Sequence, residues 1–196
     1  MRKILIVITG MVMLLMACRR ETPVIPPLPP DQTIPTLDFE FVSVGSTIKF
    51  VPFGDTLPNS GINKGYELQL SDTNERILTS SSGIVTSISP DTTAAGGSLI
   101  TVKFRRNSIY SFIYGGVTNV VVQVNDSLSG GRILGKVSGS GIVDFQFIIN
   151  NNETLCPQNY GSPGFVSAIQ QAILLSNSFS HTDTILSPCR VQSLPK

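Results

Sequence analysis

The sequence predicts a mainly β domain, an antiparallel sandwich or barrel-like sheet, with one helix near the C-terminus. Three observations lead to this prediction. Short apolar segments recur along the chain, and several alternate with polar residues, as strands with one buried face do. Turn residues separate these segments, among them Ser129-Gly130-Gly131 and Gly139-Ser140-Gly141. A single later segment has the spacing of an amphipathic helix.

The first 18 residues resemble a bacterial lipoprotein signal. Met1-Arg2-Lys3 is a short basic region, and residues 4–16 are apolar except for Thr9 and Gly10. This run is shorter than the roughly 20 residues that span a bilayer. It ends in Leu15-Met16-Ala17-Cys18, which resembles a lipobox, so we expect residues 1–17 to be removed and Cys18 to be lipidated. An ordinary signal peptide or a membrane anchor are the alternatives.

The charge balance excludes strong electrostatic partners. Removal of residues 1–17 takes two of the 14 basic side chains and leaves 12 basic against 13 acidic, a formal charge of −1. Such a chain has no field that would recruit nucleic acid or an anionic bilayer, so the membrane contact is expected through the lipid anchor only. Arg105-Arg106 is interpreted as a solvated strand end.

A proline-rich segment follows the cysteine. Pro23, Pro26, Pro27, Pro29 and Pro30 favour the polyproline II conformation and exclude a helix. We therefore predict a tether over residues 18–35 and one domain over residues 36–196, with a helical extension from about residue 156.

The apolar segments of the domain are predicted to be nine short strands. In the first, Phe39 and Phe41 are expected on one side; in the third, Tyr66, Leu68 and Leu70 are expected to face one way. The expected strands cover residues 37–42, 47–53, 66–70, 83–88, 99–104, 109–114, 120–124, 132–137 and 143–149.

One helix is predicted after residue 162. Ser162 is a suitable N-cap and Pro163 suits the first turn. An apolar stripe then follows helical spacing and is expected to pack on the sheet. Its members are Phe165, Ile169, Ala172, Ile173 and Ser176.

Two cysteines remain after Cys18 is assigned to lipid. Cys156 and Cys189 form an even pair, which in an oxidising compartment predicts a disulfide that holds the C-terminal segment to the domain. Two free buried thiols are the alternative. A zinc-thiolate site is disfavoured because two cysteines and one distant histidine lack the spacing of such sites.

Three segments resemble the LytM-type M23 metallopeptidases, which are peptidoglycan endopeptidases. The first is Asn63-Lys64-Gly65-Tyr66-Glu67, where the family has His-x-Gly-x-Asp. The second contains Tyr114-Gly115-Gly116, where the family has Tyr-x-His, and later glycines and valines that match its scaffold. The third is Ile142-Val143-Asp144-Phe145-Gln146, where the family has His-Leu-His-Phe-Glu. The resemblance implies an antiparallel LytM fold over most of the domain.

The residues that carry the family's chemistry are replaced in this sequence. The resemblance implies zinc ligands at the positions of Asn63, Glu67 and Asp144, and a further histidine at Gly116. The chain has one histidine, His181, outside all three segments. Because catalytic zinc needs three good nitrogen or oxygen ligands and an open position, we expect no catalytic residues, no zinc and no cofactor. A rebuilt oxygen-ligand metal site is the enzymatic alternative.

Strand parity still places polar residues on one face. Asp144 and Gln146 alternate with residues expected in the core, and Asn63 and Glu67 share the parity of a ligand face. We expect these four side chains to line a groove that grips a peptide or glycan. An ordinary solvated strand face is the alternative, and a calcium-type site is a third interpretation.

The resemblance implies a non-catalytic envelope lipoprotein that binds peptidoglycan or regulates a cell-wall hydrolase. Arg19 after Cys18 favours the outer membrane, with the domain facing the periplasm. A structural surface lipoprotein without a wall ligand is the remaining alternative.

Overall fold

A computed structural model describes residues 28–57, 61–93, 95–179 and 187–195. Cys18, the signal segment and His181 lie outside these residues. Within them, eleven strands join in one sheet whose pairings between named strands are all antiparallel. The predicted mainly antiparallel β fold with one α-helix is therefore confirmed for the described chain.

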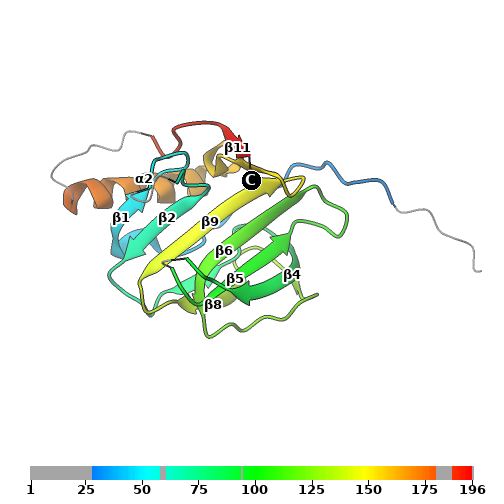
Figure 1. The fold of residues 1–196 in the computed structure, drawn as a ribbon, viewed down its shortest axis with the longest axis horizontal. Coiled ribbons are helices and arrows are strands. Elements are labelled where there is room, and N and C mark those ends of the chain that lie inside the picture. Colours follow the sequence, from blue (N-terminus) through cyan, green and yellow to red (C-terminus); the bar gives the residue numbers. More distant parts are fainter. Residues whose placement is uncertain (1–27, 58–60, 94, 180–186, 196) are drawn as a thin grey trace, which may run out of the picture.

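Seven strands form the main path of the sheet (Figure 1). Long alternating segments such as 143–149 form its centre because each can bury one apolar face. In spatial order the strands are β1 (Thr47–Val51), β2 (Tyr66–Leu70), β9 (Ile142–Ile149), β6 (Tyr110–Thr118), β5 (Ser98–Lys103), β4 (Gly83–Pro90) and β7 (Ser127–Leu128).

Four further strands branch from this path. β3 (Arg76–Leu78) pairs with β8 (Ile133–Val137), which in turn pairs with the end of β6. β10 (Glu153–Leu155) continues from β9 through a turn in which Asn150 and Asn151 have positive φ, and it pairs with β11 (Ser193–Pro195). The C-terminal segment is thus part of the sheet.

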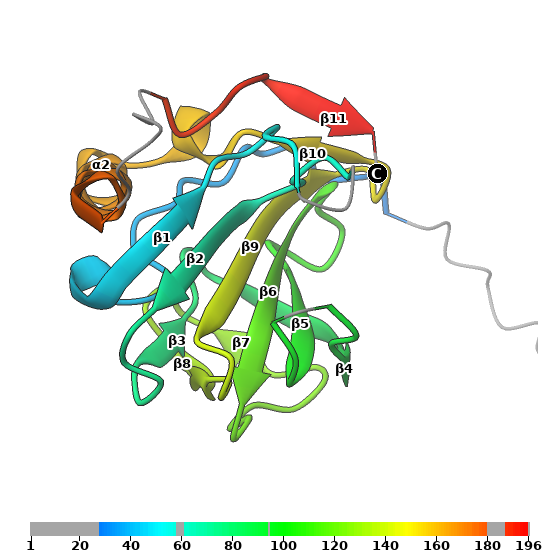
Figure 2. The ribbon, with the colours of Figure 1, turned by 60° about the vertical axis from the view of Figure 1, so that its left-hand side comes forward.

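The α-helix covers one edge of the sheet. α2 (Pro163–Phe179) follows the short 3₁₀ helix η2 (Pro157–Tyr160) and packs against β1 and the 3₁₀ helix η1 (Val44–Ser46), as Figure 2 shows. Phe165 N–H donates to Ser162 Oγ at 3.4 Å, as expected of the predicted cap. On the buried side, Ser176 Oγ accepts a hydrogen bond from Phe50 N–H at 3.0 Å, which ties the helix to β1.

Aromatic rings fill the core beneath the central strands. Phe145 of β9 is fully buried, with Phe41 stacked on it at a centroid distance of 4.8 Å and Tyr114 of β6 at 5.2 Å. Such pairs add roughly 0.5–1.5 kcal/mol each beyond the burial of their area. The core therefore fixes the residues that alternate with Phe145 on the opposite face of β9.

Two of the predicted strands are wrong. Residues 37–42 form no strand: Leu37 and Val42 make isolated bridges to Gly161 and Ile77. Phe41 is buried but Phe39 is 46% exposed, so the two rings do not share a side. Residues 120–124 also lack strand structure. Their valines do not follow strand alternation, since Val122 is buried while Val124, which would share its face in a strand, is 47% exposed. Positive-φ asparagines at 119 and 125 flank the segment.

Among the described residues, no helix is both long and apolar enough to cross a membrane.

Candidate functional site

The register of the sheet brings Glu67 and Asp144 side by side. Glu67 of β2 is directly opposite Asp144 of β9, and Gln146 follows two residues later on the same face of β9. All three side chains are half-buried, while their neighbours Leu68, Val143 and Phe145 are fully buried in the core. The strand parity predicted from the sequence is therefore present for these three residues.

Glycines leave the space in which the Asp144 carboxyl group lies. A Cβ atom on Gly65 would lie 2.3 Å from the backbone oxygen of Phe145 and 2.8 Å from Asp144 Oδ1. On the other side, β6 places Gly115 opposite Asp144, and a Cβ there would lie 3.2 Å from Asp144 Cβ. Side chains at these two positions would displace the carboxyl group from the face.

Asp91 is a fourth member of this face, and no sequence motif indicated it. It lies in the loop between β4 and β5, is 8% exposed, and accepts a hydrogen bond from Gly116 N–H at 3.0 Å through Oδ2. Its Oδ1 accepts hydrogen bonds from the backbone N–H and hydroxyl group of Thr93, at 2.9 and 2.6 Å. We call Glu67, Asp91, Asp144 and Gln146 together the acidic face.

Burial and like charges act together on Asp144. Desolvation, with smaller contributions from the charges of Glu67 and Asp91, raises the pKa of Asp144 to about 7. Gln146 Nε2–H donates to Asp144 Oδ2 at 2.7 Å, which favours the ionised form and opposes the rise. The raised pKa extends the pH range in which the Asp144 carboxyl group is protonated and can donate as well as accept a hydrogen bond.

The amide of Asn63 is used by the backbone of its own loop. Asn63 is 5% exposed, and its Nδ2 donates to Val51 O at 3.0 Å and to Pro52 O at 3.1 Å. Its Oδ1 accepts a hydrogen bond from Gly65 N–H at 3.3 Å. The side chain thus satisfies backbone groups between β1 and β2, while the other three predicted groove residues lie on the sheet face.

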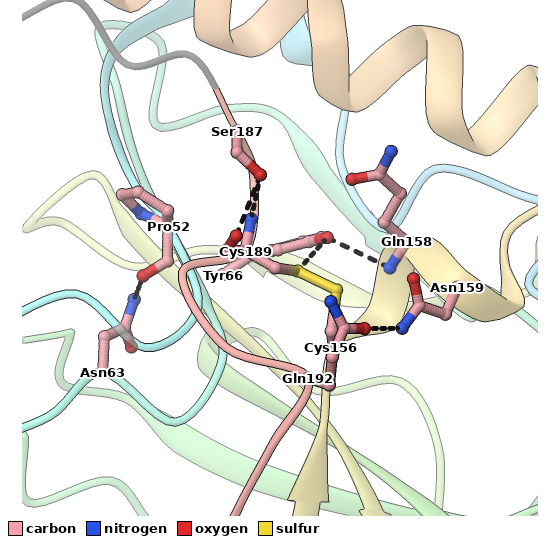
Figure 3. Close-up of a disulfide and its surroundings, with 9 residues drawn as sticks. All are labelled: Pro52, Asn63, Tyr66, Cys156, Gln158, Asn159, Ser187, Cys189 and Gln192. Carbon is pink, nitrogen blue, oxygen red and sulfur yellow. Dashed lines mark hydrogen bonds between the residues drawn. A yellow bond between two sulfur atoms is a disulfide. The ribbon is translucent and has the colours of Figure 1, made fainter.

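The predicted disulfide between Cys156 and Cys189 is present and holds the C-terminal segment beside this loop (Figure 3). Phe53 N–H donates to Pro188 O at 3.0 Å, and Arg190 N–H donates to Phe53 O at 2.8 Å. Cys156 N–H donates to Gln192 O at 2.8 Å. The bridge and these hydrogen bonds fix residues 187–192 against the loop that contains Asn63.

The donors at this place do not fit the zinc site that the family resemblance implies. Asn63 presents an amide that is already engaged, Gly116 has no side chain, and Asp144 is held by Gln146 and has a raised pKa. Glu67 and Asp144 are adjacent, and both oxygens of the third carboxyl group, Asp91, already accept hydrogen bonds from Thr93 and Gly116. Catalytic zinc in proteins takes three ligands, mostly imidazole. Within the described ranges, no group of three or more His, Cys, Asp or Glu side chains is arranged to hold a metal ion.

Comparisons with solved structures find M23-type domains. The catalytic domain of lysostaphin from Staphylococcus simulans matches with 19% identity and a TM-score of 0.46, over 55% of this chain and 84% of that one. The catalytic domain of a variant of the prophage-encoded M23 protein EnpA from Enterococcus faecalis matches with 17% identity and a TM-score of 0.47, over 60% and 95%. A chain of the SpoIIQ–SpoIIIAH pore-forming complex matches with 18% identity and a TM-score of 0.49, over 70% and 98%.

These similarities concern the arrangement of strands and not the chemistry of the site. The solved structures that are similar to this chain include M23-type domains, the type that the sequence motifs indicate. No protein-family model matches the chain, and no curated protein matches it.

Proposed function

We propose that this chain is a non-catalytic M23-like protein of the bacterial cell envelope that binds peptidoglycan or regulates a wall hydrolase. In this proposal Cys18 carries the lipid anchor, residues 18–35 are the tether, and the domain faces the periplasm from the outer membrane. The observation that carries the proposal is the acidic face: polar side chains are kept in register across β2 and β9, without the imidazoles that the related metallopeptidase motifs contain.

The chemistry of the acidic face favours a peptide over a glycan. Glu67 offers a carboxylate, and Asp144 with Gln146 offers paired acceptors and donors on a rigid strand. Such groups bind amide N–H groups, and a carboxylate binds a free amine more strongly through charge-assisted hydrogen bonds. Free amines belong to the peptide part of peptidoglycan, whereas its N-acetylated sugars offer neutral amide and hydroxyl donors. The hydrogen bond between Gln146 and Asp144 pre-orders the two side chains, which lowers the entropy that binding must overcome.

The alternative of a rebuilt metal site depends on the carboxyl groups of the same acidic face. Calcium prefers six or more oxygen ligands, and magnesium prefers a near-octahedral set of oxygen ligands. Glu67 and Asp144 provide two carboxyl groups on adjacent strands, and both oxygens of Asp91 already accept hydrogen bonds from Thr93 and Gly116. The raised pKa of Asp144 also opposes its use as an anionic ligand. We therefore place binding ahead of metal-dependent hydrolysis.

Sedimentation with purified sacculi tests the binding proposal. We expect the wild-type chain to pellet with sacculi and Glu67→Gln to bind about tenfold more weakly, since a hydrogen bond to a charged group contributes roughly 1.5–3 kcal/mol. Glu153→Gln is the matched control because Glu153 lies on β10, away from the acidic face. Wild-type protein that stays in the supernatant would favour the structural-lipoprotein alternative. Equal binding by both variants would place the contact elsewhere on the domain.

A further inference from the structure

The first described residues pack against the end of the β5–β6 hairpin. Asp31 N–H donates to Asn107 O at 2.7 Å, and Ile109 N–H donates to Asp31 O at 3.0 Å. Asn150 N–H in the neighbouring β9–β10 turn donates to Ile109 O at 2.8 Å. The chain therefore enters the domain at the end of the sheet formed by these two turns, where β11 also finishes (Figure 1). We call this the hairpin end.

Three cations lie at the hairpin end, and one of them is paired. Arg105 forms an ion pair with Asp31 at 3.2 Å and lies over the Phe104 ring at 4.9 Å. Arg106 is exposed, and Lys103 is half-buried beside it. The charge of Asp31 is compensated by Arg105, so the charges of Lys103 and Arg106 make the local electrostatic potential positive.

Two cavities meet at Lys103 and Arg106. One has a volume of about 340 Å³ and is also lined by Leu28, Pro30 and polar residues of both turns. The other, of about 220 Å³, lies on the far side of the same two cations and includes Asn125 and Ser127. No carboxylate is among the described residues that line either cavity. Cations with surrounding amide and hydroxyl donors suit the oxygens of a phosphate group.

An apolar side chain stands beside the larger cavity. Leu28 is 73% exposed at the point where the described chain begins, next to the prolines of the tether. An exposed aliphatic side chain next to two cations matches the boundary between headgroups and acyl chains of a bilayer, where both parts are satisfied.

We infer that the hairpin end faces the membrane and that Lys103 and Arg106 hold an anionic phospholipid headgroup between the two cavities. This inference rests on the proposed anchor at Cys18. Cys18 and Leu28 are ten positions apart in the sequence, and ten steps of a polyproline II chain would span about 31 Å. Two cations bind an anionic surface weakly on their own, but a short tether keeps them near it at high effective concentration. The acidic face then extends away from the membrane along β9.

The orientation is testable with the chain from Cys18 to Lys196 coupled through the Cys18 thiol to a maleimide lipid in vesicles. This polypeptide contains every described residue, and the disulfide leaves Cys18 as the reactive thiol. Chemical coupling makes the test independent of whether cells acylate Cys18. Vesicles of phosphatidylcholine alone are compared with vesicles that contain phosphatidylglycerol, and lysine acetylation is followed by mass spectrometry.

Lys136 is an internal control. Lys103 pairs with Ser111 and Lys136 pairs with Thr118, so the two lysines lie near opposite ends of β6, about 23 Å apart along the strand. We expect acetylation of Lys103 to fall at least about fivefold on the anionic vesicles, the effect of one cation near such a surface. Lys136 should be labelled equally on both.

Two variants and one soluble probe complete the test. Arg106→Gln should remove most of the protection of Lys103, whereas Arg76→Gln, at the end of β3 beside Lys136, should preserve it. Equal labelling of Lys103 on both vesicles, or equal protection of Lys136, would overturn the inference. Full protection of Lys103 by inorganic phosphate without vesicles would also overturn it, because the site would then take free phosphate.

Discussion

Replacement of Asp144 by asparagine removes an ionisable group that the fold holds partly out of water. Asparagine keeps the size of the side chain, and its Oδ1 can still accept the hydrogen bond from Gln146. The carboxyl group of Asp144 has a pKa of about 7 in the folded chain, against a usual value of 3.8. Folding therefore takes up a proton between these two values.

The sign of the pH effect follows from this uptake. A carboxyl group whose pKa rises on folding does not lower the free energy of unfolding below its unfolded pKa. The free energy of unfolding then falls as the pH rises from the unfolded pKa through the folded pKa. The interval from 3.8 to about 7 corresponds to about 4 kcal/mol at 1.36 kcal/mol per pKa unit. Asp144 is half-buried, so water screens part of this penalty, and we expect about 2 kcal/mol.

Urea denaturation at pH 5 and at pH 8 measures the effect. We expect Asp144→Asn to be about 2 kcal/mol more stable than the wild type at pH 8, and the difference to shrink at pH 5, where the wild-type carboxyl group is mostly protonated. Asp38→Asn is the control, because Asp38 is exposed. It should change stability by less than about 0.5 kcal/mol at both pH values. A variant difference that does not depend on pH would refute the reasoning.

Three further predictions concern packing, the disulfide and the anchor. Gly65→Ala should destabilise the domain by about 3 kcal/mol, because its methyl group meets a backbone oxygen 2.3 Å away, whereas Gly139→Ala, with nothing within 4 Å, should be nearly neutral in urea titrations. Replacing both Cys156 and Cys189 by alanine should cost about 3–4 kcal/mol for a separation of 33 residues, and alkylation of Cys156 or Cys189 in the freshly isolated wild-type chain would contradict the bridge. Cys18→Ser should abolish acyl labelling in cells and release the chain from membranes; labelling that persists would exclude the lipobox interpretation.

Alternation of polar and apolar residues predicted two central strands of the sheet. Residues 66–70 and 143–149 alternate cleanly, and both form central strands. Residues 37–42 alternate too, but their backbone partners are single residues on distant elements, such as Gly161 and Ile77. β3, β10 and β11 were not predicted because each has three residues, so its pairing depends on a partner far along the chain.

The candidate site shows the same division between local and tertiary information. Strand parity was enough to place Glu67, Asp144 and Gln146 on one face, because residues directly opposite each other on adjacent strands point to the same face of the sheet. The inward turn of the Asn63 amide depends on the carbonyl groups of Val51 and Pro52, which local pattern does not reveal. The contact of Asp91 with Gly116 joins residues 25 positions apart through a loop, and no local pattern indicates it.

Incubation of the purified chain with sacculi, followed by muropeptide analysis of the pellet, tests the central proposal most directly. The assay is run with zinc, calcium and manganese in turn, with the metal content of the protein measured alongside. We predict that the protein sediments with the sacculi and that the muropeptide profile stays unchanged under every condition. Glu67 and Asp144 supply too few ligands to hold a metal ion that activates water, and the oxygens of Asp91 are already hydrogen-bonded. Cleaved cross-links together with stoichiometric bound metal, both lost in Asp144→Ala, would contradict the proposal and identify an active enzyme.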